Sequence, residues 1–361
     1  MASNNITSNQ FITYMLSTVA ALTMMNAAPI FTRNFGQNTL IFIVIIALLT
    51  IVLLLAAGKL MQSCSYQSPY PVTVGSLGKW GGKIFYSLVC LYLVILSALA
   101  LKIFIYIINH YYLQQTPLII ISILLILPTL YTVYGGLRVF GHTSSLLYLL
   151  IGIFLVIFFF TKSNYTLSNI FPLVDHKLKA SLPYIPWSFI SSGAILSCFF
   201  FIPAIVDPKH IKRSMVIFTI LFLSLLSFTY IIGRAYFGEP FVELILPFFN
   251  LSSSYAIGPL ERLDVIFILI FIPVLGLFNS FYFLLCHKAQ KELFAKFNTK
   301  HPNIALLILA VIIVALATWV PLPNVLWNTL YLGNISNLVL ILILFIIYFI
   351  YFLRKRRGKV C

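Results

Sequence analysis

Ten long apolar stretches fill nearly the whole of this 361-residue chain, and each is long enough to cross a bilayer. A hydrocarbon core of about 30 Å needs about 20 apolar residues in a helix. Unpaired backbone groups are costly in lipid, so spans of this kind must be helical. The sequence therefore predicts an all-α integral membrane protein with about ten transmembrane helices.

The remaining composition leaves no room for a soluble domain. Charged residues make up only 8% of the chain, against about a quarter in soluble proteins. We therefore predict one polytopic domain over residues 1–361, with a first half of about 10–161, a second half of about 184–353 and a basic tail at 354–361. The predicted spans are 10–31, 39–62, 84–108, 117–133, 144–161, 184–206, 214–233, 260–286, 304–321 and 335–353.

The basic residues predict the orientation. With a cytoplasmic N-terminus and ten spans, sixteen Lys and Arg residues fall on the inner side, six fall on the outer side, and Lys102 lies within a span. This asymmetry obeys the positive-inside rule and places both termini in the cytoplasm. The net charge of +16 is thus mostly a topology signal, and nucleic-acid binding is not expected.

Polar and kinking residues interrupt the first span. Pro29 lacks an amide hydrogen and displaces the carbonyl of Met25, four residues earlier. Thr23 and Asn26 offer side-chain hydrogen bonds beside the freed backbone groups. We predict a break in the helix here, with Thr23 and Asn26 facing a solute.

The sixth span is interrupted at the matching position in the second half. Residues 191–193, Ser-Ser-Gly, can unwind at low steric cost, and Pro203 disturbs the carbonyl of Phe199. Matched breaks in two halves are typical of proteins that bind a solute near the middle of the bilayer, where positive helix ends attract a carboxylate. The alternative is that small residues permit close helix packing and the prolines only kink. The candidate binding residues of this span are Ser191, Ser192, Gly193 and Ser197.

Four charged residues lie at membrane depth or at the start of a span. Lys102 lies about two turns inside the third span and needs an acceptor, so it either pairs structurally or contacts a solute or ion. Glu261, Arg262 and Asp264 open the eighth span. The two carboxylates favour a positive helix start, although a gating or proton-coupling role is also open.

Nothing in the sequence predicts an enzyme, a cofactor or a metal site. The five cysteines are scattered without a Cys-x-x-Cys pair, and His, Asp and Glu form no cluster with ligand spacing. The segment 241–249 is apolar but too short to cross the bilayer, and we expect it to form a helix on the outer interface.

Several segments, in order along most of the chain, together resemble one family. They are Ile6-Thr7-Ser8-Asn9-Gln10, Leu77-Gly78-Lys79-Trp80-Gly81-Gly82-Lys83, Gly135-Gly136-Leu137, Leu167-Ser168-Asn169-Ile170-Phe171-Pro172-Leu173 and Leu260-Glu261-Arg262-Leu263-Asp264. The chain resembles the B-subunit family of bacterial spore germinant receptors, within the amino acid/polyamine/organocation transporter superfamily.

The resemblance implies two inverted five-helix repeats with a solute pocket between helices one and six. It implies a subunit that senses amino acids or similar nutrients, works with A and C partner subunits and resides in the spore inner membrane. Carried over by position, the pocket involves the stretch around Ala21, Thr23 and Met24 and the stretch Ser191-Ser192-Gly193-Ala194. Family members often carry Gly-x-Gly in span one, where this chain has Ala21 and Thr23.

Two other functions remain open. The first is an ion-coupled amino acid permease, because the same fold serves transport and fold alone does not settle function. The second is a conduit for ions or water that opens during germination. The nutrient-sensing subunit is the favoured hypothesis.

Overall fold

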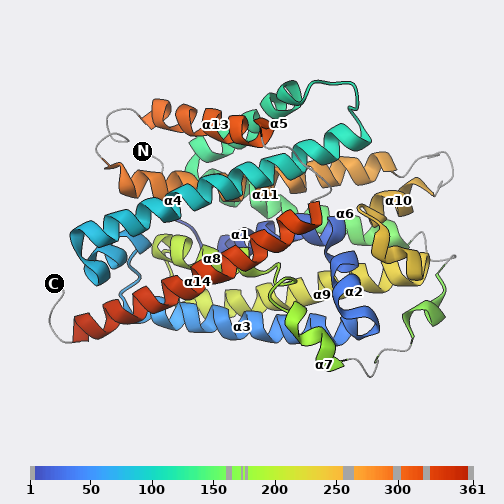
Figure 1. The fold of residues 1–361 in the computed structure, drawn as a ribbon, viewed down its shortest axis with the longest axis horizontal. Coiled ribbons are helices and arrows are strands. Elements are labelled where there is room, and N and C mark those ends of the chain that lie inside the picture. The colour runs from blue at the N-terminus through green and yellow to red at the C-terminus, as the bar shows by residue number, and fades with distance from the viewer. Residues whose placement is uncertain are drawn as a thin grey trace.

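Helices occupy all ten predicted spans in the computed structural model (Figure 1). In the part of the chain that the structure describes, the one β-type pairing is a parallel bridge between Ile6 and Ile205. The described residues are 5–159, 165–171, 174, 178–254, 264–295, 302–319 and 326–356.

The first half of the chain supplies five spans. Three consecutive helical segments form the first: α1 (Ser8–Leu22), the π-helix η1 (Thr23–Ala27) and α2 (Ala28–Phe35). After the short 3-10 helix η2 (Gly36–Asn38), the other four are α3 (Thr39–Ser63), α4 (Pro69–Tyr111), α5 (Leu118–Tyr134) and α6 (Gly136–Phe159).

The second half supplies the other five spans. They are α8 (Ser192–Phe201), α9 (Ile211–Phe237), α11 (Asp264–Leu293), α13 (Pro302–Trp319) and α14 (Leu326–Arg356). Short helices lie between them: η4 (Leu167–Ile170), α7 (Leu178–Ser181), η5 (Leu182–Tyr184), η6 (Ile202–Ala204), η7 (Pro208–His210), η8 (Glu239–Glu243) and α10 (Pro247–Ser253).

Helix length and hydropathy match a membrane protein. Six segments of the described chain are long and apolar enough to cross a bilayer, and the first of them, Ser8–Ser63, contains the first two spans. Three shorter apolar helices correspond to α5, α8 and α13. The predicted class, an all-α membrane protein, is confirmed.

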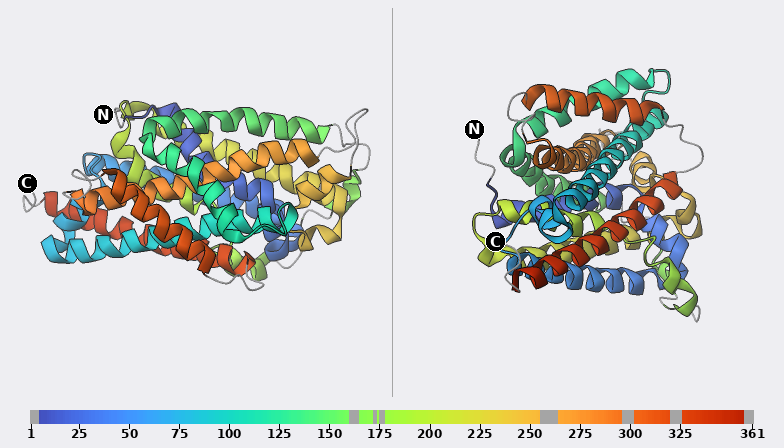
Figure 2. Two further views of the ribbon diagram at one scale, coloured as in Figure 1. Left: turned by 90° about the horizontal axis from the view of Figure 1, so that it is seen from above. Right: turned by 60° about the vertical axis from the view of Figure 1, so that its left-hand side comes forward.

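The two helices with predicted breaks lie at the centre of the bundle. Figure 1 shows α1 and α8 in the middle, with α3 and α9 along one side and α5 and α13 along the other, and the second view of Figure 2 keeps this order. Helix α1 packs against α6, α8, α9 and α11, and every residue of α8 is buried. Polar side chains on these two helices are therefore shielded from lipid.

Helix α4 begins earlier than the third predicted span. Gly78 has a positive φ of 81°, which an L side chain rarely adopts, and it separates the stretch before it from the long membrane helix after it. The two parts pack closely, because a Cβ added at Gly82 would lie 2.5 Å from the Val74 Cα. Residues 69–83, which precede the predicted span, thus form a helical hairpin with its start, and Trp80 is 79% exposed.

The segment 241–249 differs from the surface helix that its sequence predicts. It falls in two short helices, η8 and α10, and the side chains of Phe241 and Phe248 are completely buried. Helix α10 contacts η1 and α11, and η8 contacts α2, so the segment covers the second half of the first span. Gly233 permits this packing, since a Cβ there would collide with the Phe241 ring.

Candidate functional site

The interruption of the first span is a π-helical segment. Residues Thr23–Ala27 form η1, directly before α2, where Pro29 cannot donate to the Met25 carbonyl. The backbone stays right-handed helical at both ends of η1, so the helix changes its register without unwinding. Such π-helical segments are frequent at functional sites.

All four candidate residues of the first span are fully buried: Ala21, Thr23, Met24 and Asn26. Thr23 Oγ1 donates to the Val19 carbonyl at 2.5 Å, which satisfies its hydroxyl within the helix. Asn26 differs, because neither its Nδ2 nor its Oδ1 has a hydrogen-bond partner among the described residues. A buried amide without partners is costly, so Asn26 marks the first span as a place that could receive a polar group.

The interruption of the sixth span is a true break in the α-helix. The first part of the predicted span consists of the end of η5 and the turns after it, and α8 begins only at Ser192. Pro203 lies in η6, the 3-10 turn that follows the last residue of α8. The sequence placed the break correctly, at the Ser-Ser-Gly stretch.

Side chains from other helices satisfy the serines around this break. Thr50 of α3 and Ser191 share a hydrogen bond of 2.6 Å between their hydroxyls. Asn337 of α14 donates to Ser192 Oγ at 3.4 Å, and Asn34 of α2 donates to Ser188 Oγ at 2.7 Å. The start of α8 is thus tied to three other helices.

Sequence reasoning missed these partners. No sequence motif marks the three partners, which are Asn34, Thr50 and Asn337. The only signal was that each is a single polar residue within or beside an apolar span.

Gly193 allows α1, α8 and α11 to approach one another. A Cβ at this position would lie 3.2 Å from the Thr18 Cβ and 2.8 Å from the Tyr282 hydroxyl. Ala194 and Ser197 are completely buried, and Ser197 Oγ donates to the Ala194 carbonyl at 2.5 Å. The structure therefore brings α8 against α1 at Thr18, whereas η1 further along packs against α9 and α10.

Aromatic side chains pack between the first half of α1 and the last turn of α8. The Tyr14 ring stacks on Phe140 of α6, with centroids 4.8 Å apart, and on Phe201 of α8, at 5.2 Å. The Tyr14 hydroxyl donates to the Leu137 carbonyl. Phe281 of α11 packs edge-on against Phe201.

The N-terminal segment adds a backbone connection at the same end. Ile6 donates to the Ala204 carbonyl at 3.0 Å, and Val206 donates back to the Ile6 carbonyl at 3.1 Å. Thr7 and Gln10 form a capping box at the start of α1. The interrupted region is thus covered by α10 at one end and by the aromatic and backbone contacts at the other.

Two of the four charged candidates lie among the described residues. Lys102 is buried within α4, with 7% of its surface exposed, and Asp264 is buried in the first turn of α11, where a carboxylate suits the positive helix end. Glu261 and Arg262 lie outside the described residues. The sequence predicts a hydrogen-bond acceptor for the Lys102 ammonium, and that contact stays a prediction.

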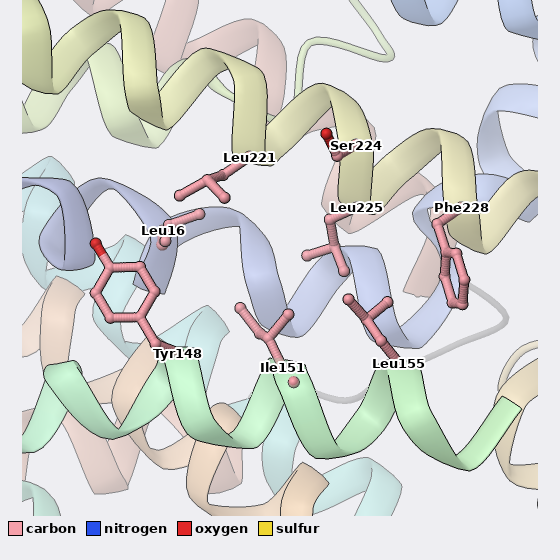
Figure 3. Close-up of a pocket in the computed structure, with 9 residues that line it drawn as sticks. Leu16, Tyr148, Ile151, Leu155, Leu221, Ser224, Leu225 and Phe228 are labelled. Atoms are coloured by element: carbon pink, nitrogen blue, oxygen red, sulfur yellow. The ribbon is translucent and has the colours of Figure 1, made fainter. Parts of the chain in front are cut away.

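A cavity of about 320 Å³ lies between α1, α6 and α9 (Figure 3). Leu16 reaches it from α1, Ile151 and Leu155 from α6, and Leu221 and Leu225 from α9. Its described lining includes none of the residues predicted to bind solute. The apolar walls suit a hydrocarbon group, and the polar candidates lie elsewhere on α1 and α8.

Comparison with protein-family models gives a match over residues 5–322, to the family described as spore germination protein. The chain belongs to the spore germination protein family. A search of curated proteins finds no significant match.

Family membership and the helical bundle together give the general function. This member is a permease-like membrane protein of spore germination, in agreement with the resemblance read from the sequence. The match includes both interrupted spans and the α5–α6 turn at Gly136, where a positive φ of 72° reverses the chain.

Proposed function

We propose that this protein is the nutrient-sensing subunit of a spore germinant receptor, and that it binds a small solute, such as an amino acid, between helices one and six. The observation that carries the proposal is Asn26. Its side-chain amide is fully buried in a π-helical segment, and both polar atoms lack partners among the described residues. A solute with a carboxylate or an amino group would supply the missing hydrogen bonds.

The helix break at Ser191–Ser192 supplies the second element of the proposed site. The Ser192 and Ala194 amides donate to the Phe189 and Ser191 carbonyls, so the contribution of this end is the positive end of the α8 dipole, which favours a carboxylate. Residues 21–26 and 191–197 would line the pocket. Lys102 and the 261–264 stretch would act as gating or structural charges.

The two ends of the proposed pocket are covered, which supports a sensing mechanism. Aromatic residues around Tyr14 cover one end, and α10 covers the other. A solute shifts the equilibrium between two arrangements only if it binds one of them more tightly. In this proposal solute binding moves the two inverted five-helix repeats, residues 10–161 and 184–353, relative to each other. The A and C subunits of the spore inner membrane would receive the change, with both termini of this chain in the cytoplasm.

A thermal-shift screen of the purified chain against amino acids, sugars and nucleosides tests the proposal. A ligand at 100 times its Kd adds about 2.7 kcal/mol of stability, which is readily seen as a rise in Tm. We expect an amino acid to give such a rise and Asn26→Leu to abolish it. Asn303→Leu, at an exposed position of α13, is the matched control and should keep the response. A full response in Asn26→Leu would refute the site.

An ion-coupled amino acid permease is the second candidate, and the permease-like family favours it. Uptake of labelled amino acid into proteoliposomes separates the two functions. Robust flux by the isolated chain would establish transport, whereas binding without flux agrees with a sensor.

A further inference from the structure

A cavity of about 300 Å³, with polar and charged side chains in its lining, lies beside the starts of α4 and α6, away from the proposed solute site. Its lining includes Ser68 before α4, Gly136 at the start of α6, and His287, Lys288 and Lys291 of α11. A volume of this size is at the lower end of the range for small-ligand sites. Many of the groups around it carry positive charge or a positive dipole end.

Two long helices begin at this cavity. Helix α6 starts at Gly136, so its first amides and its positive dipole end are directed toward the space that Gly136 and Leu137 line. Helix α4 starts directly after Ser68, whose side chain makes no capping bond. Pro69 and Pro71 lack amide hydrogens, so α6 offers more donors than α4. Two such helix ends at one cavity favour an anion.

The side chains of α11 add formal charge. Lys291 is exposed at the cavity, and the Lys288 ammonium donates to the Phe200 carbonyl near the end of α8. His287 is only 5% exposed, and its Nδ1 has no hydrogen-bond partner among the described residues, with Gln290 beside the ring. An oxyanion could accept from this ring and from both ammonium groups.

One carboxylate opposes the positive charge. Glu292 lines the cavity, and its Oε2 accepts from the Tyr86 hydroxyl at 2.5 Å, which holds the carboxylate in place. The two lysines outnumber it, so the formal charge of the lining is positive without any charge on His287.

We propose that this cavity is an anion-binding site that takes a carboxylate or phosphate group from the cytoplasmic side. The site is separate from the nutrient pocket, and the proposal does not depend on nutrient sensing. Pro203 and Ala204 at the end of α8 also line the cavity, and the N-terminal segment bonds to Ala204. A bound anion would therefore join the starts of α4 and α6 to the last turns of α8 and α11.

The probe for the test is inorganic phosphate, with chloride at equal ionic strength as reference. The full chain in nanodiscs of phosphatidylcholine should show a saturable rise in Tm with phosphate. Lys291→Gln should weaken the apparent affinity for phosphate about ten-fold, because it removes one charge-assisted contact. Lys59→Gln, at an exposed lysine near the inner end of α3, is the matched control and should leave the affinity unchanged.

A second variant tests whether the electrostatic potential in the cavity is positive. Glu292→Gln keeps an acceptor for Tyr86 but removes the opposing charge, so phosphate should bind several-fold more tightly. Nanodiscs that contain phosphatidylglycerol distinguish the source of the anion. Loss of the phosphate response there identifies a lipid headgroup as the occupant, and a retained response identifies a soluble anion.

Two results would overturn the anion site. One is an equal effect of phosphate and chloride on Tm in phosphatidylcholine nanodiscs. The other is equal weakening by Lys59→Gln and Lys291→Gln, which would show general surface electrostatics.

Discussion

The interruptions of the first and sixth spans differ in both backbone and polar partners. In the first span the helix continues through the π-helical segment Thr23–Ala27, and the Asn26 amide stays without partners among the described residues. In the sixth the α-helix begins only at Ser192, and hydroxyls and amides of α2, α3 and α14 satisfy Ser188, Ser191 and Ser192. One break is therefore held by its neighbours, and the other retains unused hydrogen-bonding capacity.

The difference has a local cause. A single proline removes one donor, and a π-helical turn absorbs the change while the helix continues. The Ser-Ser-Gly stretch has weak helix propensity and side chains that compete for backbone groups, so a helix can start there at low cost. We therefore expect the backbone of the sixth span to stay in place when a ligand binds, and the backbone of the first span to move.

The largest effect is expected at the contact between the two spans. Gly193→Val would place a branched side chain against Thr18 and Tyr282, so we expect a loss of about 3 kcal/mol in the free energy of unfolding, at the upper end of overpacking. Gly152→Ala is the control, because a Cβ there has no neighbour within 4 Å among the described residues. Denaturation in detergent measures both, and equal effects would contradict close packing at Gly193.

The next effect tests whether neighbours hold the sixth span. Thr50→Val leaves the Ser191 hydroxyl without its partner, so we expect a loss of about 2 kcal/mol. The double variant Thr50→Val/Ser191→Ala should be clearly more stable than the sum of the single effects predicts. Strict additivity in this double-mutant cycle would show that the two hydroxyls do not interact.

The opposite sign is expected in the first span. Asn26→Leu removes a buried amide without partners, so the ligand-free protein should gain about 1 kcal/mol of stability. Asn279→Leu is a useful contrast, because Asn279 Nδ2 donates to Thr129 Oγ1 at 3.1 Å and its replacement should destabilise. A large loss of stability in Asn26→Leu would mean that the amide has a structural partner, and the contrast between the two spans would disappear.

The smallest effect is expected where a hydroxyl bonds within its own helix. Ser197→Ala removes only the bond to the Ala194 carbonyl, so we expect a loss of about 0.5 kcal/mol. An effect on ligand-induced stabilisation without an effect on basal Tm would instead place Ser197 in direct contact with the solute.

The sequence predicted where each of the two spans is interrupted, but not the structure of either interruption. It located both interruptions, because proline and Ser-Ser-Gly act on the backbone within one turn. It did not distinguish a π-helical segment from a full break. It also did not find Thr50 or Asn337, which lie 141 and 145 residues away from the serines they contact.

By itself the sequence determined the class, the approximate positions of the membrane helices and the places where two of them are interrupted. These features follow from hydropathy and backbone chemistry within about 20 consecutive residues. Only the tertiary structure decided that Phe241 and Phe248 point inward, that the serines of the sixth span are satisfied and that Asn26 is not. The physical reason is that the partner of a buried polar or aromatic group comes from distant parts of the chain, which only packing brings together.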